Sequence, residues 1–478
     1  MATSSLLPMN PWLWSHALGE TFAAGFDPLG VGIAQRDERL AQLLGAALSG
    51  SPFYRQRYPR RGDAPRLDRF APVSKAELMH HFDDWATDRE IQRAGVEPFI
   101  HDAQRIGDPY LGRYLVWTSS GTTGEPGIFV QDALSLAAFD ALDTLRLQHL
   151  AAPAQPWPMW GQRQRFAFVA ATGGHFAGVV SFERLRRIAA STPPPLLWLA
   201  PQLQTFSVLQ PLSALADELR AFAPTVLVTY PSCADALAQA QAEGRLDLSL
   251  SQVWVGGEQL SAEQRDRIRS AFGCTLRNNY GASEFYAMAC ECAEGTLHLN
   301  HDWVILEAVD RQMRPVPPGE ASHSVLLTNL ANRVQPLIRY RLGDSVRFLA
   351  ERCACGSAFP AIEVQGRADH TLHLHDARGR EVPLLPLALS TVIEEEAGVT
   401  RFQLLCLSPT RLELRFEAEV AETKAAFQRV QAVLAAYLAT HGLPDVKIEH
   451  GSEPPLRHPR SGKLERVRLA EGARPAGG

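Results

Sequence analysis

The chain has 478 residues, 46% hydrophobic and 21% charged, an ordinary globular composition with room for two or three domains. Its formal net charge of −5 argues against a nucleic-acid-binding protein that relies on a basic surface. No apolar run reaches the ~18 residues of a membrane span, and no positive charges precede the first apolar residues as in a secretory signal. We therefore expect a soluble cytoplasmic protein.

Apolar spacing predicts a helix within residues 35–60 and a shorter one at 75–87, then a polar connection to about residue 112. From residue 114 onward, strand-like runs such as YLVWTSS, FAFVAAT, TVLVTY and SQVWVGG alternate with helical segments at 133–152, 212–223 and 233–244. This alternation predicts an α/β domain with a largely parallel sheet, whose ligands would bind at strand ends.

The pattern changes after about residue 295, where residues 296–310 and 323–330 predict β-ribbon around a PVPPGE turn. Beyond Gly366, a β-α-β-β-α-β order with helices near 386–397 and 422–441 predicts a small α+β domain. We expect a large multi-layer N-terminal domain over residues 1–366, with parallel sheets and a β-rich subdomain. A small mobile C-terminal domain over 367–478 would follow it.

The stretch TSSGTTGEPG, residues 118–127, combines small hydroxyls and three glycines with no lysine or arginine. Successive backbone amides and hydroxyls over 119–124 could wrap the phosphates of a nucleotide. The stretch is not a P-loop, since Glu125 follows Gly124 where that motif requires lysine. Any cation must therefore come from elsewhere in the chain.

Four further segments have chemistry that fits a nucleotide. VGGEQL (255–260) ends a predicted strand in two glycines, against which a flat ring could lie. YGASE (280–284) offers an aromatic ring for stacking and a carboxylate for Mg²⁺. IRYRLGD (338–344) ends in Asp344, where a carboxylate can bridge two ribose hydroxyls, and GRAD (366–369) lies at the predicted domain boundary.

With SPFYRQRYP, PVSKAEL and PRSGKLERV, these motifs in this order resemble the adenylate-forming superfamily, and most closely its phenylacetate–CoA ligase-like branch. The resemblance extends from about residue 35 to 470. It implies an enzyme that uses ATP and Mg²⁺ to convert a carboxylic acid to an acyl-adenylate with release of pyrophosphate. By family analogy the acid is aromatic, and the acyl group then passes to a thiol, with CoA as the expected acceptor.

The resemblance also implies residue roles. Lys463 would neutralise charge between the substrate carboxylate and the α-phosphate, Glu284 would hold Mg²⁺, and Asp369 would be the hinge of the C-terminal domain. Residues 370–386 depart from the family pattern at a segment that helps to line the pantetheine tunnel. The implied catalytic residues are Lys463, Glu284 and Thr122; the implied nucleotide-binding residues are Ser119, Ser120, Gly121, Thr122, Thr123, Gly124, Gly257, Glu258, Gln259, Tyr280, Gly281, Ala282, Ser283, Asp344 and Arg367.

For the carboxylate pocket, the segments 170–178 and 228–237 lie where related enzymes build this site, and their candidates are Tyr230, Ser232, His175 and Phe176. A histidine such as His175 is more often structural than a substrate contact. Lys75 could reach a phosphate, but its place at a helix start favours a surface residue. Trp117 is interpreted as a core residue.

Five metal-ligand side chains form two clusters, which β-ribbons could bring together: Cys290, Cys292 and His298, then Cys353 and Cys355. Thiolates and imidazole at such spacings fit tetrahedral Zn²⁺, although they could also be ordinary reduced thiols. Four ligands suffice, so one candidate is surplus. The resemblance implies Cys292, His298, Cys353 and Cys355, which leaves Cys290 in the core and makes the site closed and structural.

Alternatives remain at this point. The acyl group could pass to a carrier protein or an amine, or the chain could be a zinc-stabilised nucleotide-binding protein without catalysis. The intact set of Thr122, Glu284, Asp344, Arg367 and Lys463 argues against the latter. A nucleic-acid-binding zinc module is disfavoured by the acidic balance. The expected partners are a small carboxylic acid and a thiol, with no nucleic acid or membrane, and a homodimer is left open.

Overall fold

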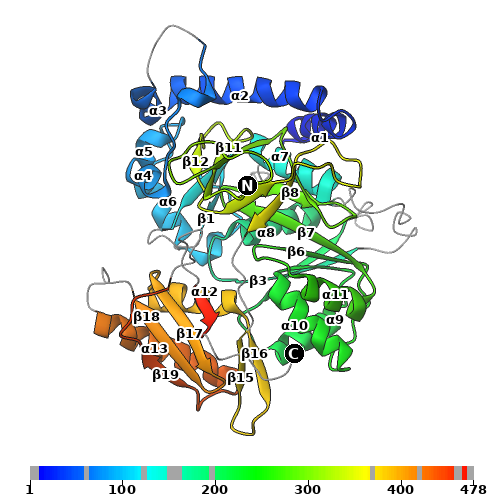
Figure 1. The fold of residues 1–478 in the computed structure, drawn as a ribbon, viewed down its shortest axis with the longest axis vertical. Coiled ribbons are helices and arrows are strands. Elements are labelled where there is room, and N and C mark those ends of the chain that lie inside the picture. Colours follow the sequence, from blue (N-terminus) through cyan, green and yellow to red (C-terminus); the bar gives the residue numbers. More distant parts are fainter. Residues whose placement is uncertain are drawn as a thin grey trace, which may run out of the picture.

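A computed structural model describes residues 10–58, 64–119, 126–147, 164–192, 200–365, 372–416, 423–456 and 466–470. Figure 1 shows a helical layer at one end of the molecule and a small sheet with two helices at the opposite end. Between them lies a large mixed sheet covered by helices. Within the described residues, no helix is long and apolar enough to cross a membrane.

The described residues between 10 and 105 form the helical layer. Asn10 and Ser74 accept hydrogen bonds from amides of the first turns of α1 and α4, which is why these helices start there. A helix also occupies the expected polar connection, which corrects that prediction: Pro98 lies inside it and masks the helical pattern. The elements are α1 (Pro11–Phe26), α2 (Val31–Gly50), α3 (Pro52–Arg57), η1 (Leu67–Arg69), α4 (Lys75–His80), α5 (Phe82–Trp85), α6 (Arg93–Ile100) and η2 (Ala103–Arg105).

The central sheet has nine strands within the described residues, in the order β13-β14-β9-β8-β7-β6-β5-β3-β4. The pairs from β4 to β7 are parallel, whereas those from β7 to β13 are antiparallel. The strands are β3 (Arg165–Ala170), β4 (Gln202–Ser207), β5 (Val226–Thr229), β6 (Gln252–Gly256), β7 (Thr275–Ala282), β8 (Phe285–Glu291), β9 (Leu297–Leu299), β13 (Ser345–Phe348) and β14 (Ala361–Gln365). The predicted α/β class with parallel strands is confirmed.

Two smaller sheets and five helices complete this part. The sheets are β1 (Leu115–Thr118) with β2 (Ile128–Gln131), and β10 (Val304–Val309) with β11 (Ser324–Asn329) and β12 (Tyr340–Arg341). The helices are α7 (Ala133–Leu142), α8 (Ala177–Ala190), α9 (Leu212–Phe222), α10 (Pro231–Ala242) and α11 (Ala262–Phe272). Each connection between two parallel strands passes through a helix. The carboxyl ends of these strands therefore lie at the same edge of the sheet.

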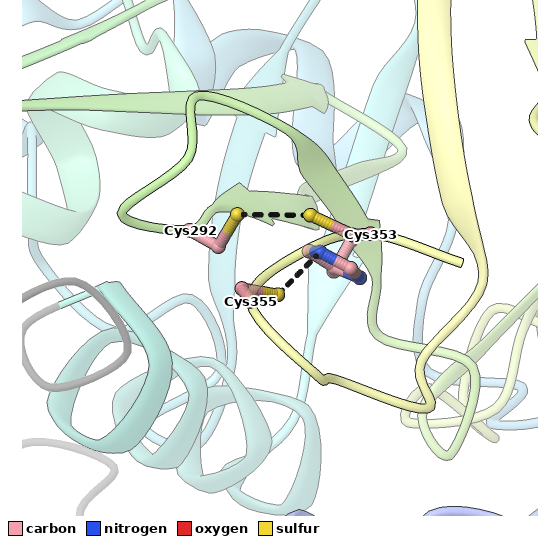
Figure 2. A group of neighbouring side chains, drawn as sticks. Cys292, Cys353 and Cys355 are labelled. Carbon is pink, nitrogen blue, oxygen red and sulfur yellow. Dashed lines mark hydrogen bonds between the residues drawn. The ribbon is translucent and has the colours of Figure 1, made fainter. Parts of the chain in front are cut away.

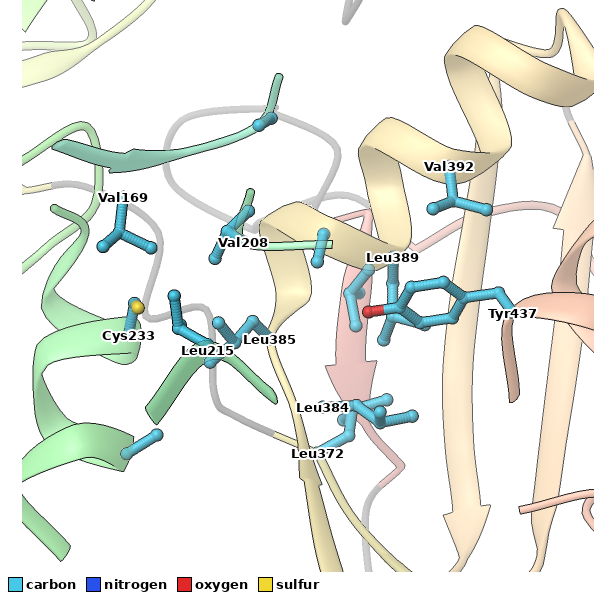
Figure 3. Packing of buried hydrophobic residues seen from close by; sticks show 14 of the residues in the cluster. Val169, Val208, Leu215, Cys233, Leu372, Leu384, Leu385, Leu389, Val392 and Tyr437 are labelled. Carbon is cyan, nitrogen blue, oxygen red and sulfur yellow. The ribbon is translucent and has the colours of Figure 1, made fainter. Parts of the chain in front are cut away.

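The C-terminal part is α+β. It contains a hairpin, a four-stranded sheet in the order β19-β18-β17-β20, and two helices. Its elements are β15 (Leu372–His375), β16 (Glu381–Leu384), α12 (Pro386–Ala397), β17 (Phe402–Ser408), β18 (Arg411–Phe416), α13 (Thr423–Thr440), β19 (Lys447–His450) and β20 (Val467–Leu469). Figure 3 shows side chains of this part, such as Leu384 and Leu389, in the same apolar cluster as Leu215 and Val169 of the large sheet region.

An irregular turn that begins at Asp143 directly follows α7. Residues Asp143–Leu147 form a π-helix, a geometry that is rare and often found near functional sites. Tyr286 donates a hydrogen bond to Asp143 at 3.3 Å, and Arg184 holds the neighbouring Asp140 through two bonds of 2.9 and 2.8 Å. Burial, with a smaller contribution from Asp140, raises the pKa of Asp143 to about 7.

Asp143→Asn is expected to stabilise the protein above neutral pH. A raised carboxyl pKa contributes stability that is complete below the unfolded pKa and lost as pH rises through the folded pKa. The gain in the free energy of unfolding should therefore grow between about pH 4 and 7, towards an upper bound of about 4 kcal/mol. Melting temperatures across this range measure it, with the exposed Asp445→Asn as control. A difference that does not vary with pH contradicts the assignment.

Candidate functional site

The VGGEQL segment forms a tight turn at the end of β6. Gly257 has a φ of +81°, and a Cβ there would lie 3.3 Å from the Tyr230 ring. Glu258 accepts a hydrogen bond from the Ser232 amide, in the first turn of α10, at 3.0 Å. A carboxylate at a helix N-terminus is favourable, and it fastens the turn to α10. Gln259 is exposed beside it.

The YGASE segment covers the end of β7 and the turn that leads into β8, and its glycine is required by a close backbone approach. A Cβ at Gly281 would lie 1.8 Å from the Tyr286 carbonyl oxygen, far inside contact distance. Trp117 Nε1 donates to the Ser283 carbonyl at 2.7 Å, and Ser283 Oγ donates to the Thr118 carbonyl at 3.3 Å. The turn is therefore fastened to the end of β1, where the predicted phosphate loop begins.

Glu284 is the buried carboxylate of this turn. Its side chain is 6% exposed, and Tyr340 donates a hydrogen bond to Oε1 at 2.6 Å. Burial raises the pKa of Glu284, whereas the Tyr340 hydrogen bond and the positive charge of Lys75 act in the opposite direction. A deprotonated carboxylate here would therefore gain from a nearby cation.

Asp344 lies close to this turn, although 60 residues separate it from Glu284. Tyr280 donates a hydrogen bond to Asp344 Oδ2 at 2.9 Å, and the negative charge of Asp344 is one of the influences that raise the pKa of Glu284. Burial, reinforced by Asp344, raises the pKa of Tyr280 well above its usual value, so the phenol stays a neutral donor. The structure thus brings Tyr280, Glu284 and Asp344 together.

The predicted carboxylate-pocket residues lie on neighbouring elements. His175 is buried, its Nε2 is 3.2 Å from the Asp102 carbonyl, and its own carbonyl accepts from the Thr118 amide at 2.7 Å. These contacts fit the structural interpretation of the ring. Phe176 precedes α8 and bridges to Thr118, whereas Ser232 lies buried at the start of α10.

A cavity of about 930 Å³ opens beside the loop that contains His175. Its walls include Gln104, Thr172, Gly173 and Ser207. None of the four predicted pocket residues lines it. The cavity borders the segment 170–178, in which two of the four predicted residues lie, through Thr172 and Gly173.

The four predicted zinc ligands converge (Figure 2). Ligand atoms of Cys292, His298, Cys353 and Cys355 all lie within 4.8 Å of one another. The Cys292 and Cys353 sulfurs are 3.7 Å apart, and Cys355 Sγ is 3.3 Å from His298 Nε2. Sulfurs ~2.3 Å from a tetrahedral zinc would be ~3.8 Å apart, so the separations suit that ion.

The orientation of His298 also suits a metal. Its Nδ1 lies 2.9 Å from the Phe359 carbonyl, which can only accept a hydrogen bond, so the proton resides on Nδ1. That leaves a lone pair on Nε2, the atom facing the sulfurs. Cys290 lies outside the cluster and is buried next to Asn279 and Asn300, as expected for a core residue.

Known proteins share parts of this sequence and its fold. The family model described as AMP-binding enzyme matches residues 203–322, which contain both VGGEQL and YGASE. An open conformation of 2-hydroxyisobutyryl-CoA ligase, in complex with 2-HIB-AMP and CoA, matches with a TM-score of 0.52, 20% identity and 90% coverage of both chains. The same ligase in the thioesterification state gives a TM-score of 0.55 and 20% identity, over 98% of this chain and 93% of that one.

Residues 203–322 thus match the AMP-binding enzyme family, and the chain as a whole shares the fold of a solved 2-hydroxyisobutyryl-CoA ligase. The phenylacetate–CoA ligase-like branch stays a prediction. Protein CapK of Staphylococcus aureus is 29% identical over 131 residues, 27% of this chain. The aligned part spans only 28% of that relative's length.

Several residues implied by the superfamily resemblance lie outside the described part of the chain. Ser119, which precedes them, is described: its amide donates to the Gly127 carbonyl at 2.9 Å, which closes the base of the predicted phosphate loop. The implied site residues that lie outside the described ranges are Ser120, Gly121, Thr122, Thr123, Gly124, Arg367, Asp369 and Lys463.

Sequence reasoning missed one residue of this candidate site, Tyr340, and interpreted another, Lys75, as a surface residue. Tyr340 lies inside the IRYRLGD motif, four positions before Asp344, but only the fold shows that it holds Glu284. Lys75 is half-buried rather than a free surface lysine, and its charge acts on both Glu284 and Glu394 of α12. The PVSKAEL motif that contains Lys75 was the available signal. Trp117 is buried, as expected for a core residue.

Proposed function

We propose that this chain uses ATP to activate a carboxylic acid as an acyl-adenylate, releasing pyrophosphate, and then transfers the acyl group to a thiol. The observation that carries the proposal is the attachment of the Glu284 turn to the end of β1. It brings a buried carboxylate beside the start of a loop rich in backbone donors and hydroxyls. Such a pair suits a magnesium nucleotide.

Each described residue would have a definite task. Glu284 would hold Mg²⁺, and the hydrogen bond from Tyr340 would fix the orientation of its carboxylate. Mg²⁺ would neutralise phosphate charge as pyrophosphate departs. Asp344, positioned by Tyr280, would accept from the ribose hydroxyls, and Gly257 would leave backbone open to the adenine ring.

The lysine content supports roles for two cations. The chain has 47 lysines and arginines, but only Lys75, Lys424, Lys447 and Lys463 are lysine. A compact ammonium can approach a phosphate where a planar guanidinium does not fit. Two of the four lysines fall in the motifs PVSKAEL and PRSGKLERV. We assign Lys463 to the reacting carboxylate and α-phosphate, and Lys75 to the charge balance around Glu284.

The proposed acid is aromatic and the proposed thiol is CoA. Support for CoA is the shared fold with a ligase solved in complex with 2-HIB-AMP and CoA. The proposed division is an adenylation domain over residues 1–366 and a lid over 367–478 that turns about Asp369. The lid would carry Lys463 into the site for adenylation and away from it for thiol transfer.

A pyrophosphate-release screen over aryl and alkyl acids tests the proposal, with each acid assayed with and without CoA. An acid that releases pyrophosphate and forms a CoA thioester is the expected result. Pyrophosphate release without a thioester would point to a carrier protein or an amine as acceptor. ATP binding without turnover of any acid would favour a nucleotide-binding protein without catalysis and overturn the proposal.

The Cys292, His298, Cys353 and Cys355 cluster is proposed to hold a structural Zn²⁺. Four protein ligands leave no open position for substrate. Cys292 directly follows β8, whereas Glu284 directly precedes it, so roughly 20 Å of strand separates the cluster from the magnesium site. The ion would join the β8–β9 turn to the loop between β13 and β14.

Cys355→Ser is expected to lose stoichiometric zinc and to lower the melting temperature, because the remaining three ligands hold the ion less tightly. Metal analysis of purified protein and thermal unfolding measure both effects. Cys290→Ser is the matched control, and it should retain zinc. Wild-type protein purified without chelator that contains no stoichiometric zinc would contradict the metal assignment.

A further inference from the structure

The outer face of α1 exposes large aromatic side chains. Trp12 is 86% exposed, Phe22 56% and Phe26 78% within the described part of the chain. Helical spacing places them on one stripe with two small residues, Ser15 and Gly19. Phe22 and Phe26 contact each other edge to face, with ring centroids 4.7 Å apart. Contiguous exposed apolar surface of this kind marks an interaction site.

The opposite face of α1 is fixed to the body of the protein. Ala17, Thr21 and Ala24 are buried, and Trp303 Nε1 donates to Thr21 Oγ1 at 2.8 Å. Glu20 also binds Arg39 of α2 at 2.8 Å. The helix is therefore held in place with the aromatic stripe facing outward, at the end of the molecule remote from the C-terminal sheet (Figure 1).

Gly19 has no evident role in the described part of its own subunit. A Cβ at this position would meet nothing within 4 Å, and glycine in a helix interior costs about 1 kcal/mol relative to alanine. A residue without a side chain lets another helix approach closely. The position of Gly19 in the middle of the aromatic stripe therefore favours a partner that packs a helix across it.

Charge favours a protein partner over a membrane. Helices that lie on membranes carry lysine and arginine on their polar face, whereas residues 1–35 contain neither. The acidic residues of this region, Glu20 and Asp27, would be repelled by anionic lipids. The stripe is uncharged and alternates large and small side chains. The large side chains of one copy can therefore pack against the small ones of a second copy.

We propose that the α1 stripe is the two-fold interface of a homodimer, in which two α1 helices cross antiparallel with Gly19 on the axis. In this register Trp12 of one subunit faces Phe26 of the other, and Ser15 faces Ala23. No like charges meet. The three aromatic residues of both copies would bury roughly 900 Å². Smaller side chains and backbone add to that area, towards the ~1,200 Å² of specific interfaces.

Sedimentation of the full chain over a wide concentration range tests this interface. Wild type is expected at twice the chain mass, and the Phe22→Glu/Phe26→Glu double variant at the chain mass, folded, and with a melting temperature that no longer depends on protein concentration. Leu456→Glu, which replaces an exposed leucine of the C-terminal part, should remain dimeric. A wild type that is monomeric throughout, or a double variant that stays dimeric, overturns the proposal.

Cross-linking tests the register. Gly19→Cys should form a disulfide between subunits under mild oxidation, since the axis brings the two positions within disulfide reach, whereas the exposed Ala34→Cys should not. A double variant that melts below wild type even at concentrations where wild type is monomeric would show that the chain covers its own stripe, and would refute the interface. Binding of wild type to phosphatidylglycerol vesicles that the double variant lacks would instead assign a membrane.

Discussion

Lys463→Ala is expected to lower the rate of pyrophosphate release by a factor of roughly 10² to 10³ while leaving ATP affinity nearly unchanged. As the acid attacks the α-phosphate, negative charge moves onto pyrophosphate, and a positioned cation stabilises that arrangement most in the transition state. The nucleotide itself would be held by the glycine loop, Glu284 and Asp344. The variant therefore separates catalysis from binding, which acid-dependent pyrophosphate exchange and ATP titration measure independently.

Two further lysine variants make this test sharper. Lys424→Ala removes an exposed lysine of α13 and should leave both quantities at wild-type values. Lys463→Arg restores the charge with a planar group, and we expect it to stay well below wild type because a guanidinium cannot take the compact position of an ammonium. Unchanged pyrophosphate exchange in Lys463→Ala would remove this residue from the mechanism.

Glu284→Gln is expected to reduce pyrophosphate release by a factor of roughly 10² or more and to raise the Mg²⁺ concentration needed for half-maximal rate. The amide keeps an oxygen that can accept the Tyr340 hydrogen bond, but it has no charge to hold the cation. Rates measured as a function of Mg²⁺ concentration give both values. The exposed Glu320→Gln is the matched control.

Folding stability distinguishes a functional Glu284 from a structural one. Burial raises its pKa, so its contribution to stability is complete at low pH and diminishes as pH rises through the folded pKa. The neutral glutamine avoids that loss, and the variant should be at least as stable as wild type near neutral pH. A variant that is less stable than wild type near neutral pH and keeps the wild-type Mg²⁺ requirement would contradict the assignment.

The elements that sequence reasoning missed have local causes. In α1 the aromatic residues Trp12, Phe22 and Phe26 lie on the exposed face, so no polar face marks the helix. In α6, Pro98 lies inside the helix and normally signals a break. Apolar periodicity predicts a helix only where the exposed side chains are polar, a condition that α1 does not meet. In α6 the apolar Val96 and Phe99 are the buried residues, so the proline alone hides the helix.

By itself the sequence determined the α/β class, the order of the nucleotide motifs and five candidate metal ligands, from which only the family resemblance selected four. These depend on chain-local chemistry: strand and helix periodicity, glycines that permit a turn, and ligand atoms spaced two residues apart. Only the tertiary structure decided that Tyr340 holds Glu284, that Trp117 fastens the YGASE turn to β1, and that Lys75 acts on the same carboxylate. Those contacts join residues 56 to 209 positions apart, and they exist only because particular strands and helices pack together.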